Sequence, residues 1–263
     1  MSSDSSSPDT EVVVADSRAP WRPLIGLFFI VVVFYGAQLL ASIVVSLYPL
    51  LQHWSKAQAS AWFDAHSILI QFLVISASTL ITVTALRQFL SHYKLSLGFL
   101  GLSKPKWYQP MLGILTVPAY YLTFAILLSI TSMLFPDLNV NQKQDIGFNN
   151  VVGQSQLIFT FISLVVLAPL LEEIVFRGFI YKTLRRPFGI IAAGILTSVL
   201  FGAGHLLEGG DGSLLYVGAL QTFVLSLYLV WLRQKTGNLW ASITLHASNN
   251  LIAFVALFIL HTN

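Results

Sequence analysis

The chain has 263 residues, of which 56% are hydrophobic and only 10% are charged, and it contains no cysteine. A soluble domain carries about 25% charged residues and a disordered chain carries few apolar ones, so the composition argues against both classes. The absence of cysteine excludes disulfide frameworks, thiolate zinc sites and a cysteine nucleophile. The 14 Lys and Arg residues are scattered and form no basic stripe, so no nucleic-acid partner is expected. The lipid bilayer is the expected solvent and partner.

The first twenty residues are rich in Ser, Asp and Pro. No short apolar region with a small-residue cleavage site follows them, and the apolar run that does follow is too long for a signal peptide. We therefore expect residues 1–20 to form a disordered N-terminal tail and the first apolar run to stay in the membrane as an anchor.

Seven stretches without a charged residue follow this tail, and each is at least 21 residues long. A helix needs about 20 apolar residues to cross the hydrocarbon core, so each stretch is long enough for one crossing. The stretches are 23–55, 65–86, 107–136, 146–171, 187–207, 212–232 and 236–263. They predict an all-α polytopic transmembrane bundle of seven helices, or eight if the first or last stretch holds a re-entrant segment. We expect three of these helices in residues 21–145 and a catalytic core of four in residues 146–263.

Positively charged residues collect on the cytoplasmic side of membrane proteins. With seven crossings, eleven Lys and Arg residues fall on one side of the membrane, and Lys56 and Lys143 fall on the other. The eleven are Arg18, Arg22, Arg87, Lys94, Lys104, Lys106, Lys182, Arg185, Arg186, Arg233 and Lys235. Interfacial tryptophans are expected at the same helix ends, namely Trp21, Trp107, Trp231 and Trp240. Both signals place the N-terminus in the cytoplasm.

Three charged residues, Glu172, Glu173 and Arg177, are not explained by tails or loops. Apolar residues continue on both sides of them, so we expect them inside the fourth helix, where a central charge costs roughly 2.5–3.5 kcal/mol. Glu173 and Arg177 are four residues apart and can pair on one helix face, whereas Glu172 is turned about 100° away and stays free for proton transfer. The alternative interpretation is a purely structural cluster of charges.

Two histidines also fall inside predicted helices. His205 ends the fifth helix, and His246 lies in the seventh with Asn250 one turn later, so His246 and Asn250 can face a shared point. A lone histidine in a membrane helix is usually a packing residue. Two histidines and a carboxylate, however, can supply the base and the hydrogen-bond donors that peptide hydrolysis needs.

Together these motifs resemble a known family. The pattern EExxxR beginning at Glu172, FxxxH ending at His205 and HxxxN beginning at His246 lie in this order on separate apolar segments. They resemble the CAAX prenyl protease and bacteriocin-processing family of intramembrane proteases, called CPBP or Abi, over about residues 150 to 260. The resemblance implies a supporting role for Glu173 and Arg177, which orient the site.

For the reaction itself, the resemblance implies that Glu172 and His205 activate a water molecule. It implies that His246 and Asn250 stabilise the oxyanion. The expected function is that of an intramembrane endopeptidase in a bacterial plasma (inner) membrane. Its expected partner is a membrane-associated peptide or protein substrate, either prenylated or carrying a leader peptide.

A zinc version of this site stays open. Glu172, His205 and His246 would make a set of two histidines and one glutamate, which several catalytic zinc sites use. Against it, the sequence contains no HExxH or similar local pair of ligands. The favoured hypothesis therefore requires no cofactor.

The depths of the two proposed water-activating residues do not agree in a simple helical model. At about 1.5 Å per residue, Glu172 lies roughly 15 Å from a membrane edge at Lys182, and His205 lies roughly 27 Å from an edge at Pro187. Three explanations follow. Either the segment after Pro187 begins outside the membrane, or the fourth helix is tilted or kinked near Pro169, or the pairing is wrong.

Two other classes of protein remain. The first is a non-enzymatic membrane protein for bacteriocin self-immunity or scaffolding, in which the polar cluster is structural. The second is a transporter, which also buries Glu, Arg and His, although the sequence shows no inverted repeat.

Overall fold

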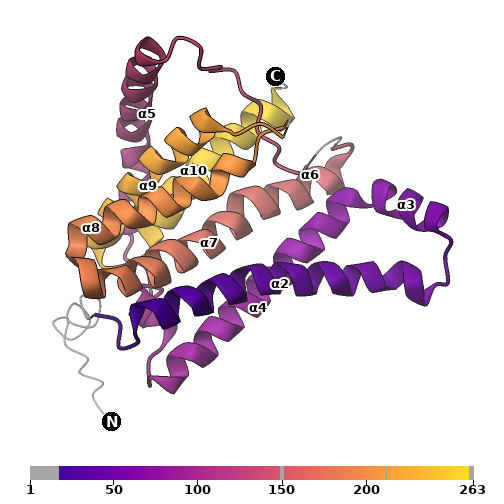
Figure 1. The fold of residues 1–263 in the computed structure, drawn as a ribbon, viewed down its shortest axis with the longest axis horizontal. Coiled ribbons are helices and arrows are strands. Elements are labelled where there is room, and N and C mark those ends of the chain that lie inside the picture. The colour runs from indigo at the N-terminus through magenta and orange to yellow at the C-terminus, as the bar shows by residue number, and fades with distance from the viewer. Residues whose placement is uncertain (1–17, 149–150, 211, 261–263) are drawn as a thin grey trace.

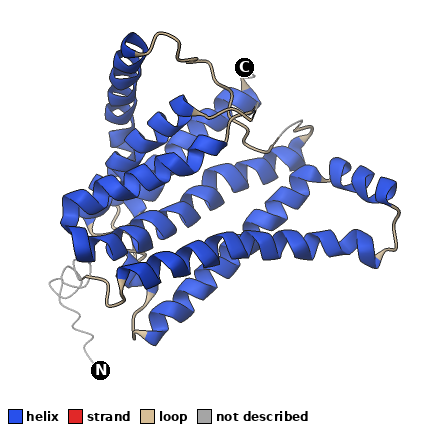
Figure 2. Ribbon diagram, viewed as in Figure 1, coloured by secondary structure: helices blue, strands red, loops and turns tan. Residues whose placement is uncertain are grey.

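The computed structural model describes residues 18–148, 151–210 and 212–260. In this part of the chain the fold is all-α, with no β-sheet (Figure 2). Six helical segments are long and apolar enough to span a membrane. They are Pro23–Leu51, Ser67–His92, Tyr108–Leu134, Gln154–Leu207, Tyr216–Thr236 and Trp240–Ile259. The chain is therefore an integral membrane protein.

The N-terminal half contains three of these helices and a short one. The long helices are α2 (Pro23–Leu51), α4 (Ser67–His92) and α5 (Tyr108–Leu134), and the short helix α3 (Lys56–Ala65) joins α2 to α4. A capping box between Ser55 and Gln58 begins α3. With ten residues, α3 is too short to cross the membrane. The stretch 23–55 thus holds one spanning helix and no re-entrant segment.

The C-terminal half begins with a helical segment of 54 residues. It contains α6 (Gln154–Phe161), the π-helix η2 (Ile162–Leu167), α7 (Ala168–Glu172), the π-helix η3 (Glu173–Ile180) and α8 (Tyr181–Gly204), and it ends with η4 (His205–Leu207). The chain continues with α9 (Tyr216–Thr236) and α10 (Trp240–Phe254), which runs on into the π-helix η5 (Val255–Ile259). The stretch 236–263 likewise shows no additional re-entrant helix within its described residues.

The 54-residue segment reverses direction at Gly189. This residue has φ 74° and ψ −171°, which are not helical angles, and Pro187 lies just before it. The part of α8 after Gly189 therefore runs back beside η3 (Figure 1). These two rods correspond to the fourth and fifth apolar stretches of the sequence.

The position of this turn removes the difference in depth between Glu172 and His205. The first rod does not end at Lys182, because the Lys182 ammonium is buried over the Phe99 ring at 3.6 Å and the helix continues beyond it. Glu172 lies sixteen residues before Phe188, and His205 lies seventeen residues after it. The two residues therefore lie at similar depth in antiparallel rods.

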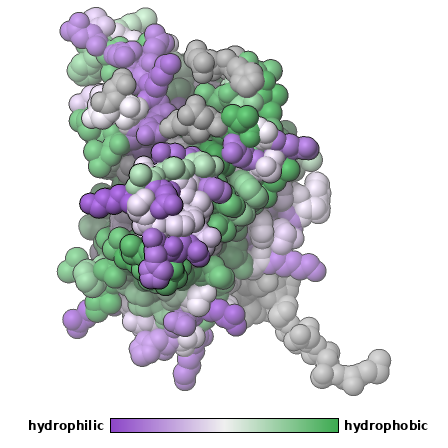
Figure 3. Space-filling model, turned by 90° about the vertical axis from the view of Figure 1, so that its right-hand side faces the viewer, coloured by the Kyte–Doolittle hydropathy of each residue, from purple (hydrophilic) through white to green (hydrophobic). Residues whose placement is uncertain are grey.

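Helix packing joins the two halves of the chain. Helix α2 pairs with α4, and α4 also contacts α6 and η2, whereas α5 lies against α10 and α9 (Figure 1). One buried cluster joins α2, α4, η3 and α8, and a second joins α5, α9 and α10. Hydrophobic areas are visible on the face that Figure 3 shows. Many large apolar side chains are exposed, for example Leu24 and Phe28. A lipid environment accounts for this exposure.

Contacts between loops gather the predicted cytoplasmic segments at one end of the bundle. The Trp21 indole donates to the Thr183 hydroxyl at 2.8 Å, and the Asn238 amide donates to the Ser103 hydroxyl at 2.8 Å. At the other end, the Gly210 N–H donates to the Lys143 carbonyl at 2.9 Å. The two groups of positive residues therefore lie at opposite ends.

The N-terminal predictions need two corrections. Residues 1–17 of the predicted disordered tail lie outside the described residues, but Ala19 is buried at 3% exposure, so the tail ends before residue 20. Trp21 is 2% exposed and stacks on Phe179 with ring centroids 4.9 Å apart. It is therefore a core residue and not an interfacial one, because the aromatic cluster at this end encloses it.

Candidate active site

The two glutamates lie at a junction between α-helix and π-helix. Helix α7 ends at Glu172, and η3 begins at Glu173. A π-helical turn has a wider hydrogen-bond spacing than an α-helical turn and often occurs at functional sites. Consecutive residues of a helix point about 100° apart, so the two carboxylates have different environments. The side chain of Glu173 is 0% exposed, whereas that of Glu172 is 24% exposed.

Glu173 and Arg177 form the ion pair that their spacing predicts. Arg177 Nη1 lies 2.8 Å from Glu173 Oε1, and both side chains are fully buried. The Arg177 guanidinium also lies over the Phe201 ring, 4.2 Å from its centroid, so it links η3 to α8. Within the described part of the chain, its Nε and Nη2 atoms have no hydrogen-bond partner. The Glu173 carboxylate and the Phe201 ring thus stabilise the buried positive charge of Arg177.

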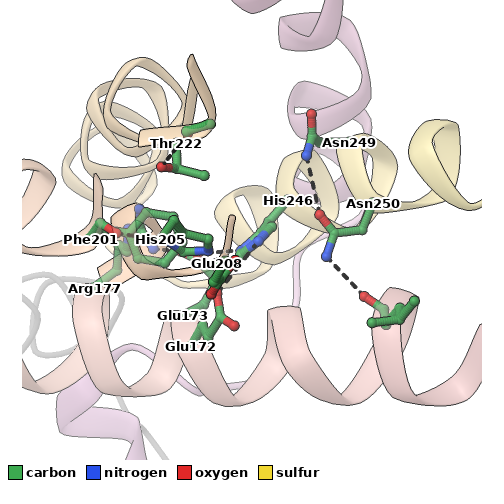
Figure 4. A network of polar contacts seen from close by, with 12 residues as sticks. Glu172, Glu173, Arg177, Phe201, His205, Glu208, Thr222, His246, Asn249 and Asn250 are labelled. Atoms are coloured by element: carbon green, nitrogen blue, oxygen red, sulfur yellow. Dashed lines mark hydrogen bonds and ion pairs between the residues drawn. The ribbon is translucent and has the colours of Figure 1, made fainter. Parts of the chain in front are cut away.

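His246 lies between the two glutamates. Its Nδ1 is 2.9 Å from Glu173 Oε1, and its Nε2 is 3.7 Å from Glu172 Oε2 (Figure 4). An ionised carboxylate only accepts hydrogen bonds, so the hydrogen bond to Glu173 places a proton on Nδ1. The Nε2 atom is then directed at the more exposed carboxylate. Glu173 therefore fixes the orientation of the imidazole of His246.

His205 lies close to the Phe201 ring, as His246 does. Its ring centroid is 4.7 Å from that of Phe201, and the centroid of His246 is 5.7 Å from it. His205 Nδ1 lies 2.8 Å from the Phe201 carbonyl oxygen, which leaves Nε2 as an acceptor. Among the described residues, the Glu172 carboxylate approaches the Nε2 atom of His246, at 3.7 Å, and makes no such contact with His205. The predicted pairing of Glu172 with His205 is therefore not a direct contact.

Asn250 does not face the same point as His246. Its Nδ2 donates to the Leu164 carbonyl at 2.9 Å, and its Oδ1 accepts from Asn249 Nδ2 at 3.2 Å. Figure 4 shows the Asn250 amide directed toward this carbonyl and away from the two glutamates. The spacing of His246 and Asn250 in the sequence predicted that both lie on one helix face. It could not show that the Asn250 amide bonds to Leu164 of η2.

Three polar residues near Asn250 were missed by the sequence reasoning. Tyr120 and Tyr121 of α5 donate from their hydroxyls to Asn249 Oδ1 at 3.1 and 3.0 Å. The available signals were two adjacent tyrosines inside an apolar stretch and a second asparagine beside Asn250. Neither signal indicates that the residues meet.

The described residues contain no group of three or more His, Cys, Asp and Glu side chains that is arranged to hold a metal ion. The proposed zinc ligands Glu172, His205 and His246 thus do not fit a metal centre in this arrangement. The cofactor requirement stays a prediction for experiment.

Residues 154–252 match the family model of Rce1-like proteins, described as type II CAAX prenyl endopeptidase Rce1-like. This part of the chain forms a domain of that family, which confirms the family resemblance. The matched range contains all six predicted site residues. Comparison with curated proteins and with solved structures gave no match.

Proposed function

From the Rce1-like domain over residues 154–252, we propose that this protein is an intramembrane endopeptidase that hydrolyses a peptide bond of a membrane-associated substrate. One observation carries the proposal. A partly exposed carboxylate, Glu172, faces the imidazole of His246, which a buried carboxylate holds in place, inside an apolar helical bundle. An acid–base pair in such surroundings is costly for stability and is suited to proton transfer.

Glu172 is the proposed general base. A water molecule beside Glu172 transfers a proton to its carboxylate as the water oxygen bonds to the carbonyl carbon of the substrate. His205 assists through its Nε2, which is free to accept a hydrogen bond from the same water because Nδ1 is engaged with the Phe201 carbonyl. The contribution of His205 is therefore through water and not through contact with Glu172.

His246 is the proposed donor to the oxyanion. Protonated His246 keeps its Nδ1 bond to Glu173 and offers Nε2–H to the developing oxyanion. Collapse of the tetrahedral intermediate breaks the C–N bond as the proton on Glu172 moves to the leaving amine.

The membrane topology that goes with this function has seven crossings. The reversal at Gly189 divides the 54-residue segment into two rods, which supports two crossings there. The gathering of positively charged loops at one end supports a cytoplasmic N-terminus. A bacterial plasma membrane is the proposed location, and prenylated C-terminal motifs or leader peptides are the proposed substrates.

Mass spectrometry of membrane peptides tests this function in cells. Membranes from cells that express the wild-type chain are compared with membranes that contain the Glu172→Ala variant at equal abundance. We expect a set of new C-termini that the wild type produces and the variant does not. Identical peptide profiles, together with a biological effect that survives the substitution, would instead support the immunity or scaffolding class.

A further inference from the structure

The chain around Pro169 leaves one backbone carbonyl inside the bundle without its usual donor. In an α-helix the Leu164 carbonyl would accept from the N–H of Ala168, but in η2 this N–H donates to the Ser163 carbonyl. The donor for a π-helical bond to Leu164 would be residue 169, which is a proline and has no N–H. The Leu164 carbonyl is therefore available to a side chain.

Asn250 of α10 occupies this position. Its Nδ2 donates to the Leu164 carbonyl at 2.9 Å, which links α10 to the helix that carries Glu172. A carbonyl inside a membrane protein must find a donor within the protein, because the hydrocarbon core contains no water to supply one. Pro169, which lies about one turn before the two glutamates, thus leaves the Leu164 carbonyl as an acceptor for Asn250.

The oxygen of the Asn250 amide is held from the side of α5, through Asn249. Tyr120, which is fully buried, and Tyr121 donate to Asn249 Oδ1. These two bonds turn the Asn249 amide so that its Nδ2 donates to Asn250 Oδ1. A chain of hydrogen bonds therefore runs from α5 through two asparagines of α10 to η2, and every donor in it points toward Leu164.

We propose that Tyr120, Tyr121 and Pro169 are positioning residues that fix the Asn250 amide from both sides, so that Asn250 holds α10, which carries His246, against the helix that carries Glu172. The catalytic part of this inference rests on the proposed protease function. Without these partners the Asn250 amide can leave the Leu164 carbonyl, and the His246 imidazole of α10 then lies in the productive position beside Glu172 for only part of the time. Errors of about 1 Å in such positions can cost 10²-fold in rate.

A double-mutant cycle tests the inference. The four proteins are the wild type, the Tyr120→Phe/Tyr121→Phe variant, the Asn250→Ala variant and their combination, each as the full chain in proteoliposomes. The substrate is a quenched fluorescent peptide that ends in a prenylated CAAX motif. We expect the tyrosine substitutions to lower kcat about 10- to 100-fold with little change in KM, and to have no further effect in the Asn250→Ala protein.

Two further variants make the cycle specific. Pro169→Ala restores an N–H five residues after Leu164, which competes with Asn250, so we expect kcat to fall in the wild type and not in the Asn250→Ala protein. Tyr228→Phe is the matched control, because the Tyr228 hydroxyl bonds to Thr123 and to the Ala119 carbonyl of α5 but does not contact the asparagines. We expect wild-type kcat for Tyr228→Phe.

Thermal unfolding of the same proteins gives a result that does not depend on activity. If the chain of hydrogen bonds is intact, the tyrosine substitutions lower the melting temperature of the wild type more than that of the Asn250→Ala protein. Equal effects in both backgrounds, on kcat or on melting temperature, would overturn the proposal. If the wild type cleaves no substrate, the proposed function fails, and the unfolding data alone decide whether the tyrosines act through Asn250.

Discussion

Two neighbouring glutamates receive different tasks because their surroundings differ. The Oε1 atom of Glu173 is shared between Arg177 and His246, and its side chain is fully buried, so burial keeps this carboxylate from a substrate. Glu172 is partly exposed and contacts the Nε2 side of His246. A proton donor or acceptor in peptide hydrolysis must reach the substrate, which favours Glu172 as the base.

Removing the positive charge of the buried pair should destabilise the protein. Arg177→Gln leaves the Glu173 carboxylate buried without its cation, so we expect a loss of about 3–5 kcal/mol in the free energy of unfolding. The measurement is reversible unfolding in detergent, with the exposed Arg87→Gln as the control. The double variant Glu173→Gln/Arg177→Gln should recover much of this loss. Unchanged stability of Arg177→Gln would show that the pair does not hold the helices.

Metal dependence is a second question at the scale of residues. The proposed hydrolysis uses Glu172, His205 and His246 as proton carriers and hydrogen-bond partners, so we expect full activity after treatment with a strong chelator. The assay combines elemental analysis of the purified protein with peptide cleavage before and after chelation. Loss of activity that added zinc restores would contradict the metal-free mechanism.

At the scale of elements, the sequence predicted helices better than their ends. Charge-free stretches found every spanning helix, because a membrane helix must be apolar over about 20 residues. These stretches gave the wrong helix end wherever a helix continues past a charged residue. Arg87 is exposed at the surface of α4, which extends to His92, and Lys182 is buried over an aromatic ring. Composition does not show whether a charge lies in a loop or on a continuing helix.

The site was predictable to the extent that its contacts are local. The pair of Glu173 and Arg177 follows from their separation of four residues on one helix. The bonds of His246 to Glu173, and of Asn250 to Leu164, join residues far apart in the sequence. Such contacts depend on how helices pack, and a single sequence contains no direct signal for them.

Close approach of α5 to α10 depends on a glycine. A Cβ on Gly113 would lie 2.5 Å from the Ala241 carbonyl oxygen, so Gly113→Ala must push the two helices apart. We expect a loss of about 1–3 kcal/mol in the free energy of unfolding.

Gly36→Ala in α2 is the matched control, because a Cβ there meets no atom within 4 Å. Its expected effect is a gain of roughly 0.5–1 kcal/mol. Equal stability of the two variants would contradict the packing at Gly113.

The whole molecule has one strongly basic end and one end with few cations. Loop contacts at the basic end, such as the bond between Trp21 and Thr183, bring segments from both halves of the chain together. In a membrane, this asymmetry sets the orientation. It also places the turn at Gly189 at the proposed cytoplasmic face, with the glutamates deeper in the bundle.

Single cysteines can test this orientation, since the chain has none of its own. Lys104→Cys and Lys143→Cys place a thiol at exposed positions of the two ends. With a membrane-impermeant maleimide, we expect labelling of residue 104 only from the cytoplasmic side and of residue 143 only from the opposite side. Labelling of both thiols from the same side would contradict seven crossings.

The central claim is that Glu172 activates water for peptide hydrolysis. Its most direct test is the initial rate of cleavage of a prenylated CAAX peptide by the purified wild type, Glu172→Gln and Glu208→Gln proteins in proteoliposomes. Glu208 is the matched control, because its carboxylate accepts from the Gln144 amide at 2.7 Å outside the proposed catalytic group. We predict a loss of at least about 100-fold for Glu172→Gln and a wild-type rate for Glu208→Gln. A wild-type rate for Glu172→Gln would contradict the claim.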